Sequence, residues 1–144
     1  MPINVDVSGN WKYTITPSVK IGAAWKAVTD AWTNIGGVWK RCFGPLTVSL
    51  NLTYAPDQSN SHNHAISVPV TATINEGIPP YSYGWVYVSG DTRIVCDNPN
   101  NLTTQWQVNA APGTYQANWQ FKVTDNRGTV VYSISVQVYL IITY

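Results

Sequence analysis

A Trp-Lys pair recurs three times near the start of this chain, as Trp11-Lys12, Trp25-Lys26 and Trp39-Lys40, with equivalent positions 14 residues apart. Such a fixed period indicates a structural repeat in which each copy is one small supersecondary unit. Around each pair, β-branched or apolar residues precede one or two small residues. We therefore expect each copy to be one short β-hairpin.

Glycines support this interpretation. Gly36-Gly37 separates Ile35 from Val38 in the third copy, and glycine adopts the positive φ that a two-residue hairpin turn requires. With this turn, Ile35 faces Val38, while Trp32 and Trp39 are diagonal neighbours. A helix is the alternative, because Trp25, Trp32 and Trp39 are spaced by seven. Two glycines inside that helix would cost about 1 kcal/mol each, which favours the hairpin.

Three hairpins of this kind need a covering surface, because an isolated two-stranded hairpin is marginally stable in water. The tryptophans either form the core of a small intramolecular sheet or contact another subunit, and both interpretations stay open. If they contact another subunit, the predicted anchor residues are Trp11, Trp25, Trp32, Trp39, Lys26 and Lys40.

The pattern changes after residue 45. Alternating strands and Gly-, Pro- or Asn-rich turns predict a seven-stranded β-sandwich. The expected strands are 46–54, 66–74, 82–88, 93–96, 102–108, 114–124 and 129–142, with breaks between them that include 55–65. The sequence thus predicts an all-β chain with a hairpin repeat over 1–44 and a sandwich over 45–144.

The sixth expected strand has the clearest alternation, since Tyr115, Ala117, Trp119, Phe121 and Val123 share one parity. One face of that strand is therefore buried. Together with a tryptophan in the third strand, these residues give the predicted sandwich core, which consists of Trp85, Tyr115, Trp119 and Phe121.

Several of these segments resemble immunoglobulin-like and polycystic-kidney-type domains. The resemblance rests on 75–85, on Gly113-Thr114-Tyr115 and on the ending Val123-Thr124-Asp125-Asn126-Arg127-Gly128. The chain departs from antibody domains, because Ala117 or Trp119 stands where their second core cysteine is expected. The element Ile35-Gly36-Gly37-Val38-Trp39-Lys40 is similar to short repeats of phage tail and tail-fibre proteins.

Both resemblances imply a non-enzymatic virion structural protein of a tailed bacteriophage. The repeat would anchor it to the tail or capsid, and the immunoglobulin-like domain would be displayed for weak adhesion to the host surface. The expected partners are other virion proteins, further copies of this chain in the particle, and host surface glycans. The expected location is the virion, assembled in the host cytoplasm. The alternative is a carbohydrate-binding or cell-surface adhesion module of bacterial origin.

Charge and hydropathy are consistent with that expectation. Charged residues make up 10% of the chain and the net charge is +1, so no basic patch attracts nucleic acid. No apolar stretch approaches the roughly 20 residues of a membrane-spanning helix, and residues 1–6 lack the features of a secretory signal. Without export, Cys42 and Cys96 are expected to stay reduced and buried.

Catalytic motifs are missing from the sequence, which has no Gly-rich phosphate loop, nucleophile elbow or Cys-x-x-Cys pair. We expect no enzymatic activity, no cofactor and no metal. His62 and His64 are the nearest approach to a metal site, but two ligands do not complete one.

Aromatic residues offer a different kind of site, because side chains exposed on a sandwich can stack on sugar rings. The candidates are Tyr81, Tyr83, Tyr87 and Trp106. The three tyrosines share the strand parity of Trp85, which favours core packing for them instead.

Overall fold

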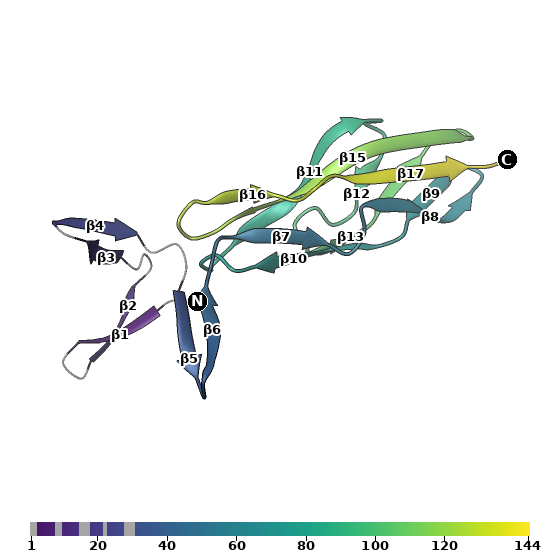
Figure 1. Cartoon of the computed structure of the whole chain (residues 1–144). Helices are drawn as coiled ribbons and strands as arrows, with labels where there is room; N and C mark the ends of the chain where they lie inside the picture. The colour runs from purple at the N-terminus through teal and green to yellow at the C-terminus, as the bar shows by residue number, and fades with distance from the viewer. Residues whose placement is uncertain (1–2, 8–9, 15–17, 22, 28–30) are drawn as a thin grey trace.

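The computed structural model describes residues 3–7, 10–14, 18–21, 23–27 and 31–144, with side chains for 23–24, 34, 36–38, 44–58 and 61–144. Every regular element in these residues is a β-strand (Figure 1), which confirms the predicted all-β class. Within the described part, no helix is long and apolar enough to cross a membrane.

The repeat folds as three separate two-stranded antiparallel sheets. They are β1 (Ile3–Val7) with β2 (Asn10–Thr14), β3 (Ser18–Ile21) with β4 (Ala24–Ala27), and β5 (Ala31–Ile35) with β6 (Val38–Phe43). In the third hairpin, Gly36 and Gly37 have φ of 62° and 84°, as a type I′ turn requires. The Gly37 amide also donates to Asn34 Oδ1 at 2.9 Å. The hairpin interpretation is therefore confirmed.

Eleven strands form the sandwich: β7 (Thr47–Leu50), β8 (Tyr54–Ser61), β9 (His64–Ser67), β10 (Val70–Asn75), β11 (Ser82–Gly90), β12 (Val95–Cys96), β13 (Thr103–Thr104), β14 (Trp106–Asn109), β15 (Gly113–Thr124), β16 (Val130–Tyr132) and β17 (Val136–Ile142). One layer contains β11, β15 and β17, with β16 also paired to β15. The other contains β7 with β10 and β13, and β9 with β14 and β12.

Strand β8 joins the two layers. Its first residues, Tyr54 to Pro56, run parallel to β17, and after an irregularity between Asp57 and Ser59 it pairs antiparallel with β9. A strand that changes sheet at a bulge closes a corner of a sandwich. The arrangement is a β-sandwich, as predicted, although it contains eleven strands and not the expected seven.

Aromatic side chains from both layers meet in the core. Trp85 of β11 contacts Trp106 of β14 edge to face, with ring centroids 5.2 Å apart, and contacts Phe121 of β15 at 5.1 Å. Such pairs add roughly 0.5–1.5 kcal/mol each beyond the burial of their area. Trp85, Tyr115 and Phe121 are buried, while Trp119 is partly buried against the same cluster.

The predicted break at 55–65 is wrong, because those residues form most of the β8–β9 hairpin. Polar residues dominate this segment and suggested a loop. In the structure the neighbouring strands β14 and β17 provide backbone partners for it, while Ala55 and Ala65 are buried. Tertiary pairing therefore outweighed the weak local strand propensity.

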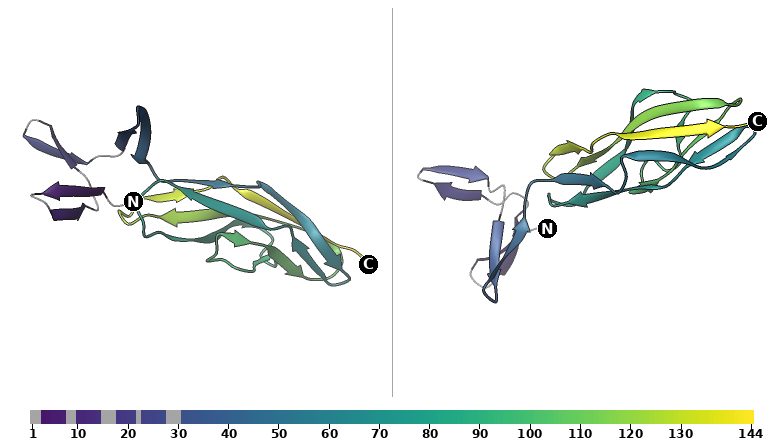
Figure 2. Two further views of the ribbon diagram at one scale, coloured as in Figure 1. Left: turned by 90° about the horizontal axis from the view of Figure 1, so that it is seen from below. Right: turned by 45° about the vertical axis from the view of Figure 1, so that its right-hand side comes forward.

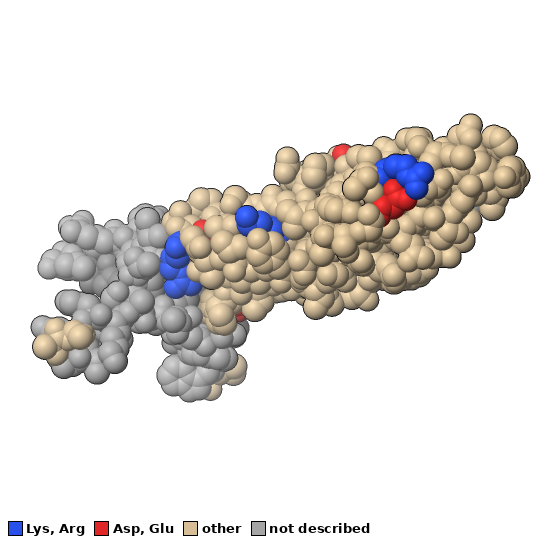
Figure 3. All heavy atoms as spheres, turned by 90° about the horizontal axis from the view of Figure 1, so that it is seen from above, with Lys and Arg blue, Asp and Glu red and all other residues tan. Residues whose placement is uncertain are grey.

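The sandwich is elongated, with the hairpins beyond one end and the C-terminus at the other (Figure 2). Charged side chains are sparse on the face shown in Figure 3, as the low charge content implies. The division into an anchor over 1–44 and a displayed domain over 45–144 stays a prediction.

Candidate functional site

The three hairpins are equivalent in register. In each, the residue pair next to the turn is followed by a pair that contains the tryptophan, and the partners of Trp11, Trp25 and Trp39 are Asp6, Lys20 and Asn34. The sequence repeat is therefore also a repeat of backbone geometry. This equivalence means that one kind of binding surface can be presented three times.

The predicted anchor residues occupy defined strand positions. Trp32 pairs with Arg41, two positions along the strand from the pair of Asn34 and Trp39, which is the expected diagonal relation. Lys26 pairs with Val19, and Lys40 with Thr33. The side chains of Trp11, Trp25, Trp32, Trp39, Lys26 and Lys40 lie outside the described residues, so their role as anchors stays a prediction.

In the sandwich, an apolar cleft of about 350 Å³ opens between β11 and β12. Its lining consists of Tyr87, Thr92, Ile94, Val95, Cys96, Pro99 and Trp119. The rings of Tyr87 and Trp119 meet edge to face with centroids 5.6 Å apart. Tyr87 remains 41% exposed, so an aromatic edge is accessible to a ligand from solvent.

The cleft has no reactive thiol. Burial raises the pKa of Cys96, outweighing the hydrogen bonds from Thr104 and Asn98 that lower it, and the sulfur lies 3.2 Å from Thr104 Oγ1. A thiol held protonated is a poor nucleophile and a poor metal ligand. The chemistry available at this cleft is therefore apolar contact.

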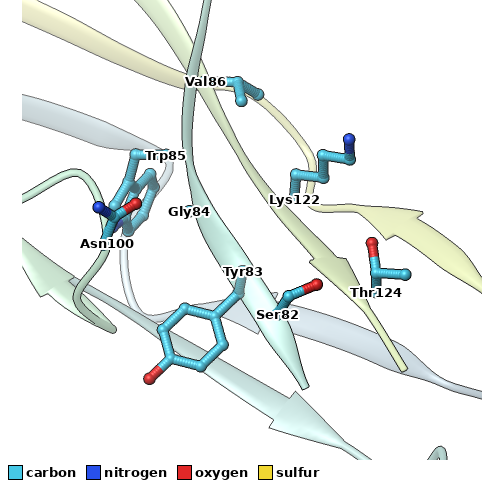
Figure 4. A pocket seen from close by; sticks show the side chains of 8 residues that line it. All are labelled: Ser82, Tyr83, Gly84, Trp85, Val86, Asn100, Lys122 and Thr124. Atoms are coloured by element: carbon cyan, nitrogen blue, oxygen red, sulfur yellow. The ribbon is translucent and has the colours of Figure 1, made fainter. Parts of the chain in front are cut away.

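A second groove, of about 290 Å³, lies on the other side of the 97–101 loop. Figure 4 shows Lys122 and Thr124 on one side of β11 and Asn100 on the other, with Gly84 between them. The remaining lining residues are Ser82, Tyr83, Trp85 and Val86. This groove differs from the first because hydroxyl, amide and ammonium groups line it.

The 97–101 loop is held on the edge of β11 by Trp85. The Trp85 backbone amide donates to Pro99 O at 2.7 Å, and its indole Nε1 donates to Asn101 O at 3.0 Å. Pro99 lines the apolar cleft and Asn100 lines the polar groove. The core residue Trp85 thus positions the loop that separates the apolar cleft from the polar groove.

Asp125, from the motif that carried the family resemblance, has a structural position. Its Oδ1 accepts from the amides of Arg127 and Thr129, both at 2.9 Å, and its Oδ2 accepts from the Ile78 amide at 3.3 Å. Burial alone would raise the pKa of Asp125, but these donors lower it below its usual value. The carboxylate therefore links the β15–β16 turn to the loop before β11 through hydrogen bonds.

Tyr81, Tyr83, Tyr87 and Trp106 have different environments. Trp106 is fully buried, so its proposed exposure to sugars is wrong. The alternation in Trp106-Gln107-Val108, whose outer two residues are buried, could have indicated this. Tyr81 donates its hydroxyl to Glu76 O, whereas Tyr83 and Tyr87 stay partly exposed at the edge of β11.

Titratable side chains are dispersed. Among the described residues, no three His, Cys, Asp or Glu side chains gather in a geometry that could hold a metal ion. His64 Nε2 lies 3.1 Å from Gln107 Oε1, while His62 is exposed in the β8–β9 turn. The absence of enzymatic activity remains a prediction.

No family model matches the sequence, and no curated protein matches it. One similar solved structure is a nucleoside hydrolase-related hypothetical protein from Saccharophagus degradans that is associated with carbohydrate metabolism. It is 12% identical, with a TM-score of 0.46, and the match covers 70% of this chain and 26% of that one. The chain thus spans about a quarter of that protein's length, and a similarity of this size transfers no activity.

Proposed function

We propose that this chain is a non-enzymatic structural protein of a tailed-bacteriophage particle. The hairpin repeat anchors it to the tail or capsid, and the immunoglobulin-like sandwich is displayed for weak adhesion to the host surface. Its location is the virion, assembled in the host cytoplasm. The observation that carries the proposal is the common register of the three Trp-Lys hairpins.

The physical support comes from the size of the hairpins. Each is a separate sheet of two strands that are four to six residues long, and such a ribbon is marginally stable in water without a covering surface. Three equivalent ribbons offer the same surface three times, so an assembled particle is a suitable partner. Tryptophan is enriched among the residues that dominate binding energy at protein interfaces.

Mass spectrometry of purified particles from the source virus tests this proposal. We expect peptides of this chain at a fixed copy number relative to the major virion proteins, retained after a high-salt wash. Absence of the chain from every particle preparation would overturn the structural role.

A second candidate is a free glycan-binding or cell-surface adhesion module, which the partly exposed Tyr87 ring at the apolar cleft favours. The two candidates differ in where the chain is found. Binding of the purified chain to cells without any particle, together with absence from particles, would favour the second candidate.

A further inference from the structure

The outer face of β11, β15 and β16 presents an aromatic ring beside a cation. Lys122 of β15 pairs with Gly84 on one side and with Tyr132 on the other, and directly opposed residues of antiparallel strands share a face about 4.5–5.5 Å apart. Tyr132 is 50% exposed. Gly84, Lys122 and Tyr132 therefore form one row across three strands.

The groove in this row exists because Gly84 has no side chain. A Cβ built on Gly84 would lie 3.1 Å from Pro99 O and 3.3 Å from Asn100 Oδ1, so the loop folds close over the strand at this position. Asn100 becomes one wall, and Lys122 and Thr124 become the other (Figure 4). Its volume of about 290 Å³ lies at the lower limit of the roughly 300–1,000 Å³ typical of small-molecule sites.

The polar groups of the groove are available to a ligand. Among the described residues, no hydrogen bond or ion pair engages the Lys122 ammonium group or the side chains of Ser82 and Thr124. The ammonium group offers a charge-assisted hydrogen bond to a carboxylate, and the hydroxyls of Ser82 and Thr124, which oppose each other in the neighbouring row, offer neutral hydrogen bonds to sugar hydroxyls. The charge of the groove therefore complements an anionic ligand.

The backbone of β15, the middle strand of the row, is not available for strand addition. At Lys122, β15 is paired with β11 on one side and β16 on the other, so its backbone amides and carbonyls are already used. A peptide adding a strand needs a free sheet edge. Recognition at Lys122 therefore comes from side chains, and a ring beside hydroxyl, amide and ammonium groups suits a sugar ring with an apolar face and a polar rim.

We propose that the row of Gly84, Lys122 and Tyr132, with Ser82, Thr124 and Asn100 around it, binds an acidic saccharide. Tyr132 stacks on a sugar ring and Lys122 bonds the carboxylate of a uronic-acid unit. This inference rests on the adhesion part of the proposed function and gives it a site and a ligand class. A single shallow groove binds weakly, with a Kd in the millimolar range, which corresponds to a binding free energy on the order of −4 kcal/mol. Many displayed copies therefore act together.

The test measures binding of the full-length purified chain to an oligogalacturonate by ligand-observed saturation-transfer NMR. The comparison probe is the same oligosaccharide with its carboxylates reduced to alcohols. We expect the acidic probe to bind at least fivefold more tightly than the reduced one. Tyr132→Ala should weaken the binding of both probes about tenfold. Lys122→Gln should weaken the binding of the acidic probe alone and so abolish the preference for it over the reduced probe.

Two control variants match these changes at distant positions. Tyr144→Ala removes an almost fully exposed tyrosine at the C-terminus, and Arg93→Gln removes an exposed cation beside Asp91. Neither should change the affinity for either probe. Circular dichroism of every variant separates loss of binding from loss of folding, because all four side chains are largely outside the buried core.

Three results would overturn the site. The first is that the wild-type chain binds neither probe at about 10 mM, above the millimolar Kd expected. The second is that Tyr132→Ala and Lys122→Gln bind as well as wild type. The third is that Tyr132→Ala dissociates an oligomer that binds no saccharide. The last result would make this face a subunit contact. These outcomes are independent of the particle analysis, since a chain present in virions with no saccharide affinity would refute the site and leave the structural role intact.

Discussion

Replacing Asp125 tests whether the turn Asp125-Asn126-Arg127-Gly128 has a structural role. Asp125 is 4% exposed, and its carboxylate accepts hydrogen bonds from the backbone amides of Ile78, Arg127 and Thr129. Hydrogen bonds to a charged group contribute roughly 1.5–3 kcal/mol each, and removing the acceptor leaves buried donors unpaired. Because such contributions are not additive, we expect Asp125→Ala to lower the free energy of unfolding by about 3–5 kcal/mol.

Asp125→Asn is a more specific test of the carboxylate, because asparagine keeps the shape of the side chain. One amide oxygen still accepts from Arg127 and Thr129, while the NH2 group faces the Ile78 amide, which is also a donor. The loss should be about 1–2 kcal/mol. Urea denaturation of the full chain, followed by near-ultraviolet circular dichroism, measures both variants. Asp91→Asn is the control, and its smaller effect is expected because the Asp91–Arg93 pair lies at the surface.

The pH dependence adds a second criterion. The pKa of Asp125 is lower in the folded chain than its unfolded value of about 3.9. Its contribution to stability is therefore complete above the unfolded pKa and is lost as pH falls through the folded pKa. The difference between wild type and Asp125→Asn should shrink as pH falls below about 4. A difference that stays constant from pH 6 to the acid limit of folding would refute the role assigned to the carboxylate.

Three further predictions concern other parts of the chain. Trp39→Ala should weaken association with particles by about 2 kcal/mol or more if Trp39 is a central anchor, with the sandwich still folded by circular dichroism; unchanged sedimentation with particles would contradict the anchor. Gly90→Ala should destabilise the sandwich more than Gly128→Ala in urea denaturation, because a Cβ at Gly90 would lie 2.5 Å from a backbone carbonyl oxygen of β15, while Gly128 faces open space. Equal losses of unfolding free energy would show that the positive φ alone determines the destabilisation. In a Cys42→Ser background, Cys96 should react with a thiol reagent at pH 8 only as fast as the chain opens, since burial raises its pKa; rapid labelling of the folded chain would refute its burial.

The sequence alone predicted those elements in which the hydrophobic pattern and the turn residues indicate the same structure. Gly36-Gly37 specified a turn of two positive-φ residues, and the register of the third hairpin followed from it. The alternation from Tyr115 to Val123 likewise predicted β15, because a strand with one buried face has a period of two.

The sequence was less informative where pairing partners decide the structure. The segment 55–65 has a polar composition that suits a loop, yet β9 and β17 pair with it as a strand. Tyr83 and Tyr87 share the parity of Trp85, but on the edge strand β11 only Trp85 is buried, and it is the residue that the 97–101 loop contacts. Parity predicts which side a residue faces and does not predict which residues of that side a neighbouring loop covers.

What the sequence determined by itself was therefore the all-β class, the hairpin turns and the central strand, because these depend on residues adjacent in the chain. Only the tertiary structure decided which residues meet across strands. Lys122 and Tyr132 face each other across the β15–β16 turn, but Gly84 is distant in sequence and becomes their neighbour only through the register of β11 on β15. Register is set by the packing of a whole face against the core, so this row could not be read from any local pattern.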